Sequence, residues 1–287
     1  MFSIRDGQGP IRTLELHDGD AVSIAEIAPS RGGMLTRWTA RGTRVLHLDE
    51  VSFLDLEKNV RGGVPILFPS PGKLSGGRWS RDGRGGEMAQ HGFARNLPWD
   101  VVARGTDGAA RATLRLASSD ATLAAFPFRF ALEVTYVLAG AKLRLDVRVA
   151  NEGAETMPFG FGLHPYFEVP CADKPKVRIP TKATRAWDNV AKREVPFRGF
   201  DFGGAEIDLH LRDHGASEAA LELPSGRVVV RGSPEFSHWV VWSVAGKDYV
   251  CLEPWTCPGD ALNTGEGLLH VPPGAERALF VEIELVA

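Results

Sequence analysis

Residues 130–150 read FALEVTYVLAGAKLRLDVRVA, and this stretch decides the fold class. On either side of AGAK (139–142), apolar and polar residues alternate, as they do in a strand with one buried face. A short link that contains glycine between two such runs is typical of a hairpin turn. The sequence therefore predicts two antiparallel strands, 130–138 and 142–150, joined by a tight turn.

The same period of two recurs along the rest of the chain. Strand-like runs are RVVVRG (227–232), HWVVWSV (238–244) and ALFVEIELV (278–286), and PSGR (224–227) predicts a turn. Helical periodicity is scarce, and SDATLAAF (119–126), with a serine at the N-cap position, is the best candidate for a short helix. Many short antiparallel strands with few helices predict an all-β protein.

Length and composition bound the class of protein. The chain has 287 residues, 44% of them apolar, and its net charge of −3 comes without a basic patch, which argues against nucleic-acid binding. No apolar run reaches the 18 or so residues of a membrane helix, and the N-terminus lacks the pattern of a signal peptide. Three cysteines do not indicate a disulfide framework, so we expect a cytoplasmic protein.

We expect one domain spanning residues 1–287, because no linker interrupts the pattern. The glycine-rich stretch SPGKLSGGRWSRDGRGGEMAQ (70–90) is flanked by apolar motifs, and we interpret it as a long excursion over one face of that domain. No repeat indicates a propeller or a solenoid. For the oligomeric state, which the sequence leaves open, we expect a monomer or a weak homodimer.

Titratable side chains stand in apolar or glycine-rich surroundings at four places. The stretches are RGGVPILFPSPGKL (61–74), QHGFARNLPW (90–99), GFGLHPYFEVP (160–170) and CLEPWT (251–256). The first surrounds an expected buried strand, VPILFP, with a basic residue near each end. Burial raises the pKa of a carboxylate, and histidine titrates near neutrality, so these stretches are candidates for proton transfer.

Three residues in these stretches are candidates for proton transfer. Glu253 ends an apolar strand with no lysine or arginine near it in sequence, so burial would make it a base near neutral pH. His164 lies among aromatic residues just before a proline, and it could act as an acid or a base. His91 precedes a glycine in a loop. Each has an ordinary structural alternative: a solvated or paired carboxylate at a strand end, or a histidine hydrogen-bonded to backbone.

Other kinds of site find less support. His91, His164 and Glu253 could in principle ligate a metal, but no two histidines share one element at ligand spacing, so we expect no metal. The sequence lacks a G-x-S-x-G elbow, a P-loop and a dinucleotide-binding motif. We interpret the remaining histidines as structural or solvated; they are His17, His47, His210, His214, His238 and His270.

Four motifs in a fixed order, GGVPILFP (62–69), QHGFAR (90–95), FGLHPYF (161–167) and LEPW (252–255), resemble the aldose 1-epimerase, or galactose mutarotase-like, family. The late segment GDALNTGEGLLHVPPGAE (259–276) resembles the end of that family's chains. The resemblance spans nearly the whole chain. It implies a β-supersandwich of large antiparallel sheets, with a sugar site on a concave surface and no cofactor.

The resemblance also implies roles for individual residues. It places the catalytic base on Glu253, the catalytic acid on His164 and a substrate-binding histidine on His91. A sugar-binding aspartate is expected at Asp208, with Asp188 as the second choice.

Basic substrate-binding residues are expected at Arg61, Lys73 and Arg95. Many relatives carry an Asn-Arg pair where this chain has Gly72-Lys73, so the resemblance does not specify the contacts to the sugar hydroxyls at that point.

The resemblance implies an isomerase, an aldose 1-epimerase that interconverts the α and β anomers of a small-molecule aldohexose by acid–base ring opening. A second interpretation is a glucose-6-phosphate 1-epimerase, because several cations gathered on one rim could bind a phosphate. A third is a carbohydrate-binding protein without catalysis. The cations in or beside the first two motifs are Arg61, Lys73, Arg78, Arg81, Arg84 and Arg95.

Overall fold

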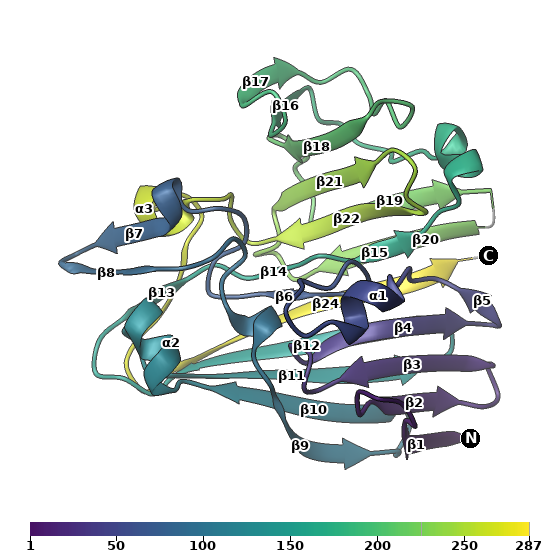
Figure 1. Cartoon of the computed structure of the whole chain (residues 1–287), viewed down its shortest axis with the longest axis horizontal. Coiled ribbons are helices and arrows are strands. Elements are labelled where there is room, and N and C mark those ends of the chain that lie inside the picture. Colours follow the sequence, from purple (N-terminus) through teal and green to yellow (C-terminus); the bar gives the residue numbers. More distant parts are fainter. Residues whose placement is uncertain (225, 287) are drawn as a thin grey trace.

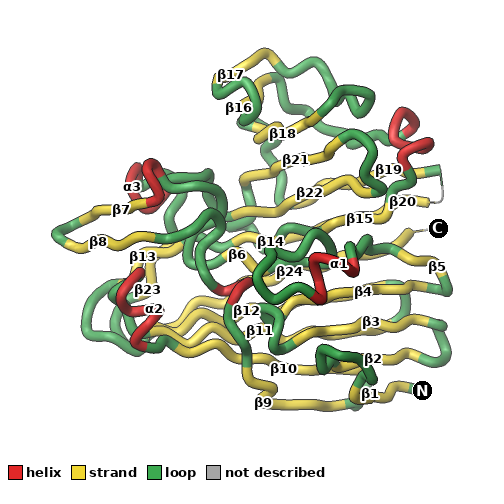
Figure 2. Tube along the Cα trace, in the orientation of Figure 1, coloured by secondary structure: helices red, strands yellow, loops and turns green. Residues whose placement is uncertain are grey.

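The computed structural model describes residues 1–224 and 226–286, and strands dominate them. Figure 2 shows strands through most of the chain, with short helical segments in the connections between them. The prediction of an all-β protein is therefore confirmed. No described helix has the length and apolar character needed to cross a membrane.

The predicted hairpin 130–150 lies within a seven-stranded antiparallel sheet. Its two strands pair in register from Phe130 with Asn151 to Ala139 with Lys142, and every second side chain is buried against the core. All neighbours in this sheet are antiparallel. In spatial order the strands are β19 (Glu218–Leu223), β20 (Gly226–Gly232), β24 (Glu276–Val286), β12 (Lys142–Asn151), β11 (Phe130–Ala139), β10 (Ala110–Ala117) and β9 (Asp100–Gly105).

A second sheet, built from the N-terminal strands, packs against the first. Figure 1 shows it lying over β9 to β12, and its first three strands contact β10 and β11. Leu16, Ile27 and Leu35 point from this sheet into the shared core and are fully buried. Its strands are β1 (Phe2–Asp6), β2 (Leu14–Asp18), β3 (Ser23–Ala28), β4 (Met34–Ala40) and β5 (Thr43–Arg44).

A third sheet continues this layer, because isolated bridges join Leu35 to Val64 and Leu46 to Phe167. One of its faces packs on the core and the other carries the site described below. In order, its strands are β17 (Arg193–Pro196), β16 (Arg185–Asp188), β18 (Glu206–Leu211), β21 (His238–Val244), β22 (Tyr249–Trp255), β14 (Gly162–Leu163) and β6 (Ile66–Leu67), and β15 (Tyr166–Glu168) also pairs with β22.

The remaining elements are short. Two small antiparallel pairs complete the strands: β7 (Arg78–Arg81) with β8 (Arg84–Glu87), which form a hairpin, and β13 (Met157–Phe159) with β23 (Leu269–Val271), which come from distant parts of the chain. The predicted helix at 119–126 is confirmed as α2, where Ser119 and Thr122 form a capping box. The helical segments are α1 (Glu50–Leu54), α2 (Asp120–Ala125), α3 (Ala261–Thr264), η1 (Ser75–Gly77), η2 (Ala94–Asn96) and η3 (Cys171–Lys176).

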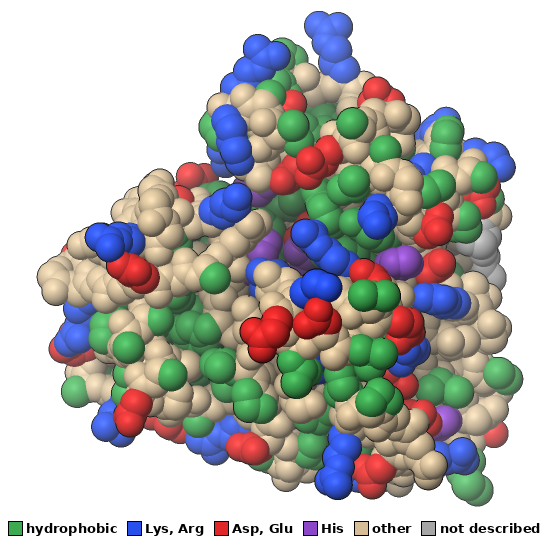
Figure 3. Space-filling model, in the orientation of Figure 1, with side chains coloured by type: hydrophobic (Ala, Val, Ile, Leu, Met, Phe, Trp, Pro, Cys, Tyr) green, Lys and Arg blue, Asp and Glu red, His purple; other side chains and the backbone are tan. Residues whose placement is uncertain are grey.

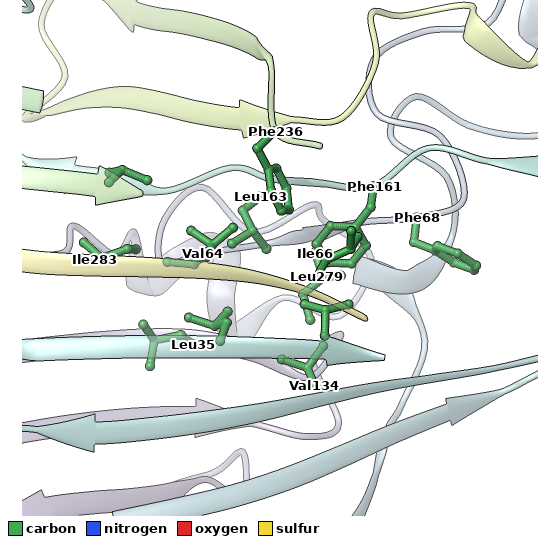
Figure 4. Close-up of a cluster of buried hydrophobic side chains, with 14 of the residues drawn as sticks. Leu35, Val64, Ile66, Phe68, Val134, Phe161, Leu163, Phe236, Leu279 and Ile283 are labelled. Carbon is green, nitrogen blue, oxygen red and sulfur yellow. The ribbon is translucent and has the colours of Figure 1, made fainter. Parts of the chain in front are cut away.

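One hydrophobic cluster connects the three large sheets. Figure 4 shows side chains from β4, β6, β11, β14 and β24 meeting between the layers. Burial of apolar surface on this scale is the main stabilising term of such a fold. The labelled side chains, all buried, are Leu35, Val64, Ile66, Phe68, Val134, Phe161, Leu163, Phe236, Leu279 and Ile283.

The local predictions at residues 64–69, 70–90 and 224–227 have different outcomes. The run VPILFP (64–69) is buried as expected, but β6 keeps only Ile66–Leu67, because the flanking prolines have no N–H for the ladder. The stretch 70–90, predicted as an irregular excursion, contains the β7–β8 hairpin. The predicted turn PSGR (224–227) includes Ser225, which lies outside the described residues.

Candidate active site

A pocket of about 850 Å³ opens on the face of the third sheet that is turned away from the core. Figure 3 shows histidine side chains deep in a hollow on this side of the molecule, with Lys and Arg side chains around it. The pocket is lined by every residue that the sequence and the resemblance placed first in the site, namely Arg61, Lys73, His91, Arg95, His164, Asp208 and Glu253.

Strand β22 explains why a carboxylate stands in an apolar strand. Side chains alternate across a sheet, so Val250 and Leu252 enter the main core while Cys251, Glu253 and Trp255 point to the pocket face. Glu253 lines the pocket, yet it is only 1% exposed. The alternation that builds the sheet thus also buries one carboxylate at the floor of the pocket.

His164 reaches the same place from the segment between β14 and β15. Its backbone N–H donates to the carbonyl of Pro65 at 3.1 Å, and its ring stacks on Tyr166 with centroids 4.7 Å apart. Gly162 permits this packing, because a Cβ there would lie 2.7 Å from the indole of Trp255. The imidazole is therefore held between an aromatic wall and the floor of the pocket.

Glu253 and His164 form a direct pair. Nε2 of His164 lies 3.3 Å from Oε1 of Glu253, and the indole N–H of Trp255 donates to Oε2 at 3.2 Å. Burial, reinforced by the charge of Asp208, raises the pKa of Glu253 well above its ordinary value. Burial and the charge of Arg95 lower the pKa of His164 to about 3. Both shifts favour the state in which the carboxyl group of Glu253 holds a proton and the imidazole of His164 is neutral, and the short contact between them lets that proton pass from one to the other.

His91 stands beside this pair in a strained backbone conformation, with a φ of +73°. The N–H of Gly72 donates to its Nδ1 at 3.0 Å, so the neutral ring carries its hydrogen on Nε2. The ring meets those of His164 and Trp255 edge-on, with centroids 5.6 and 5.7 Å away. Burial and nearby positive charge lower its pKa well below the ordinary value, which keeps it a neutral donor.

Gly72 marks the departure from the family pattern, and the structure gives a physical reason for it. Its φ is +76°, and a Cβ at this position would lie 2.7 Å from the Cα of Gly259. A side chain here would push the two loops apart, whereas glycine lets the loop close on the pocket. Lys73, the next residue, is exposed at the rim.

The six cations grouped by the sequence separate into two sets. Arg61, Lys73 and Arg95 line the pocket, and the guanidinium of Arg61 lies 5.2 Å from the ring centre of Trp242. The other three lie on the β7–β8 hairpin outside the pocket, where they pair with acidic neighbours. These pairs are Arg78 with Glu87, Arg81 with Asp82 and Arg84 with Glu155.

Asp208 lies in the pocket and Asp188 does not. Asp208 accepts hydrogen bonds from Nδ2 of Asn189 at 2.6 Å and Nε2 of His210 at 3.3 Å. Burial acts to raise its pKa, but these hydrogen bonds keep it below the ordinary value, so the group is a carboxylate. Asp188 instead accepts from the N–H groups of Val190 and Ala191 in a turn.

His210 is a pocket residue that the sequence interpretation missed. Its Nε2 faces Asp208, and its Nδ1 lies 3.0 Å from Nε2 of His238, so the partly buried Asp208 and the buried His210 and His238 form a chain of hydrogen bonds. A signal was present in the run EIDLHL, because residues two apart on a strand share a face. Once Asp208 is assigned to the site, His210 follows.

Two further cations at the pocket had no sequence signal. Lys192 follows β16 in a turn, and its Nζ donates to Oδ1 of Asn189 at 2.8 Å. Arg212 follows β18 and lies 3.8 Å from a carboxylate oxygen of Glu266. Both come from turns or strand ends whose residues read as solvated surface in the sequence.

The large antiparallel sheets, with the buried pair of His164 and Glu253 at the floor of a pocket, define a protein of the β-supersandwich class. Residues 12–284 match the aldose 1-epimerase family, and the chain belongs to that family. A protein of Cenchrus ciliaris with the provisional name glucose-6-phosphate 1-epimerase is 30% identical to it over 244 residues, which cover 81% of this chain and 68% of the relative.

Solved structures give the same fold. The Slr1438 protein of Synechocystis sp. PCC 6803 is 37% identical, with a TM-score of 0.92 and 99% of each chain covered. A galactose mutarotase-like protein from Clostridium acetobutylicum is 18% identical, with a TM-score of 0.85, and the match covers 99% of this chain and 98% of that one. The expected galactose mutarotase-like fold is therefore confirmed.

Proposed function

We propose that this protein is an aldose 1-epimerase that interconverts the α and β anomers of an aldohexose. The pair formed by Glu253 and His164, 3.3 Å apart at the floor of a covered pocket, carries the proposal. Ring opening needs one group that accepts a proton and one that donates a proton, both next to the same carbon. Membership of the aldose 1-epimerase family supports this use of the pair.

The reaction proceeds by two proton transfers in each direction. Glu253 takes the proton from the anomeric hydroxyl while His164 donates a proton to the ring oxygen, and the bond between C1 and the ring oxygen breaks. The open-chain aldehyde rotates about the C1–C2 bond. Reclosure with the roles reversed attacks the other face of the carbonyl, returns both protons and gives the other anomer.

The shared proton makes this cycle compatible with burial. Before ring opening the pair is a carboxylate beside an imidazolium, and after opening it is a carboxylic acid beside a neutral imidazole. Both states have the same net charge, so the buried pocket never gains or loses charge during the reaction. Burial favours the neutral form of each group, which is the form that the open-chain stage requires.

The other pocket residues position the sugar. Neutral His91, whose Nε2 lies 3.0 Å from the side-chain amide nitrogen of Gln90, contacts one sugar hydroxyl, and the carboxylate of Asp208 accepts from another. Arg61 and Arg95 add donors at the opposite rim. Trp255 and Trp242 offer aromatic faces to the apolar side of the pyranose.

Anomer exchange in solution tests the proposal. Freshly dissolved α-glucose and α-galactose should reach anomeric equilibrium faster with the protein than without it, measured by polarimetry or by NMR. Binding of either sugar in a calorimeter without any acceleration of exchange, for free and phosphorylated sugars alike, would show a carbohydrate-binding protein and not an enzyme.

A second candidate substrate is a hexose 6-phosphate. Arg61 and Lys73 line the pocket, and among the described residues neither has a carboxylate within ion-pair distance, so both are available to an anion. A relative provisionally named glucose-6-phosphate 1-epimerase favours the same class. A ratio of kcat/KM for glucose 6-phosphate over glucose well above one, which falls in a Lys73→Ala variant, would select the phosphorylated substrate.

A further inference from the structure

The floor of the pocket holds a cluster of three potential metal ligands. One ligand atom each from His164, Cys251 and Glu253 lies within 4.8 Å of the other two, and all three residues are buried. Cys251 and Glu253 are two apart on β22 and therefore share a face of the strand. Strand β15, which follows His164, pairs with β22 at Cys251 and brings the imidazole to the same spot.

The three donor types suit a zinc ion. Imidazole nitrogen, thiolate sulfur and carboxylate oxygen bind Zn²⁺ at about 2.0–2.3 Å in tetrahedral geometry, which places two ligands of one ion about 3.4–3.6 Å apart. Nε2 of His164 and Oε1 of Glu253 are already 3.3 Å apart. The three ligand atoms lie within 4.8 Å of one another, so the sulfur has to approach by at most about 1.3 Å, a shift within the reach of side-chain rotation.

The charge of the three ligands and the route from solvent are also compatible with a bound zinc ion. A thiolate and a carboxylate together balance the two positive charges of the ion, so the loaded cluster adds no net charge to a buried place. His164 and Glu253 line the pocket, which gives the ion a route from solvent. Three protein ligands leave the fourth position open toward the pocket, where water or a sugar hydroxyl can bind.

We propose that His164, Cys251 and Glu253 form an inhibitory zinc site. An ion held there occupies the lone pairs of Nε2 and Oε1 that exchange the proton, so zinc binding and anomer exchange exclude each other. The inhibition rests on the proposed function, whereas the binding itself does not. Cys251 takes no part in the proposed reaction, so its replacement separates the two.

Zinc titration of the chelator-treated full chain tests the site. Calorimetry should show one Zn²⁺ bound per chain in a Cys171→Ser background, which removes the partly exposed cysteine. Anomer exchange should fall in step with zinc occupancy and return when chelator is added. Cys251→Ala and Cys251→Val should keep the exchange rate and lose zinc affinity by at least about 10–100-fold, the loss that follows removal of even an outer-shell partner.

Each experimental outcome either supports or refutes the zinc site. Wild-type zinc affinity in both Cys251 variants, or no stoichiometric binding in the Cys171→Ser protein, overturns the site. If both Cys251 variants fail to fold, Co²⁺ in the Cys171→Ser protein decides, since a thiolate-to-cobalt absorption in the near ultraviolet supports the site and its absence refutes it. If the protein exchanges no anomers at all, the proposed function fails while the binding and cobalt results still test the site.

Discussion

Two sheet faces of this molecule arise from the same alternation of side chains along strands, but one exposes its charged side chains to water and the other buries them. On the outer face of the β9–β12, β24, β20 and β19 sheet, charges pair across strands: Arg148 bonds Glu133 at 3.0 Å and Glu276 at 2.7 Å. The Arg148 side chain is 48% exposed there. On the pocket face of the third sheet, the side chains of His164 and Glu253 are only 9% and 2% exposed.

The difference comes from what covers each face. Water screens the outer ladder, so its ion pairs contribute little to stability and keep the sheet solvated. Loops around residues 59–61, 72–75 and 90–95 and the β16–β17 hairpin border the pocket face. Burial under this cover shifts the pKa values of its acid and imidazole groups, and such shifts mark sites of proton chemistry.

The largest expected effect on activity comes from a substitution on the pocket face of the third sheet. Glu253→Gln removes the proton acceptor while keeping the size of the side chain, and we expect the acceleration of anomer exchange to fall by about 10²–10⁴-fold. The matched control is Glu133→Gln on the outer ladder, which should leave exchange unchanged. NMR exchange rates for both variants make the measurement. Equal exchange rates for Glu253→Gln and wild type would show that Glu253 is not the catalytic base.

His164→Asn should have the next largest effect. The amide cannot donate a proton to the ring oxygen as an imidazolium does, so we expect a loss of about 10²-fold or more in kcat. His270→Asn, at an exposed histidine, is the control. Circular dichroism shows whether each variant folds. A folded His164→Asn protein with wild-type kcat would contradict the assignment of the acid.

A smaller effect is expected from His210, which lines the pocket beside Asp208. His210→Phe removes one hydrogen-bond donor from Asp208, the proposed substrate-binding carboxylate, so KM should rise about tenfold with a smaller change in kcat. His210→Gln keeps an N–H donor and should restore part of the affinity. Steady-state kinetics of both variants separate this positioning role from a general loss of structure, which would reduce kcat as well.

The smallest effect is expected on the outer ladder itself. Arg148→Ala removes two exposed ion pairs, so the free energy of unfolding should fall by less than about 1 kcal/mol. Anomer exchange should stay at the wild-type rate. Urea unfolding and the exchange assay measure the two quantities. A loss of activity here would show that the two faces are not independent.

Local patterns predicted most of the fold. The hairpin 130–150 and strand β24 follow from alternation and turn residues that lie next to one another in sequence. The site was harder to predict from sequence, because Glu253 and His164 come from distant segments and only the family resemblance placed them together. The position of His210 was implied by Asp208 two residues earlier, whereas Lys192 and Arg212 depend on loop geometry that no local pattern encodes.

The pH dependence of kcat/KM for the wild-type enzyme tests the shared proton most directly. A second proton can enter the pair only near the lowered pKa of His164, about 3, and the single proton leaves only at the raised pKa of Glu253. We therefore predict that kcat/KM does not fall when the pH is lowered from neutral to about 5, well below the usual histidine pKa. A half-loss of kcat/KM near the ordinary histidine pKa of 6.5, in protein that circular dichroism shows to be folded, would contradict the account.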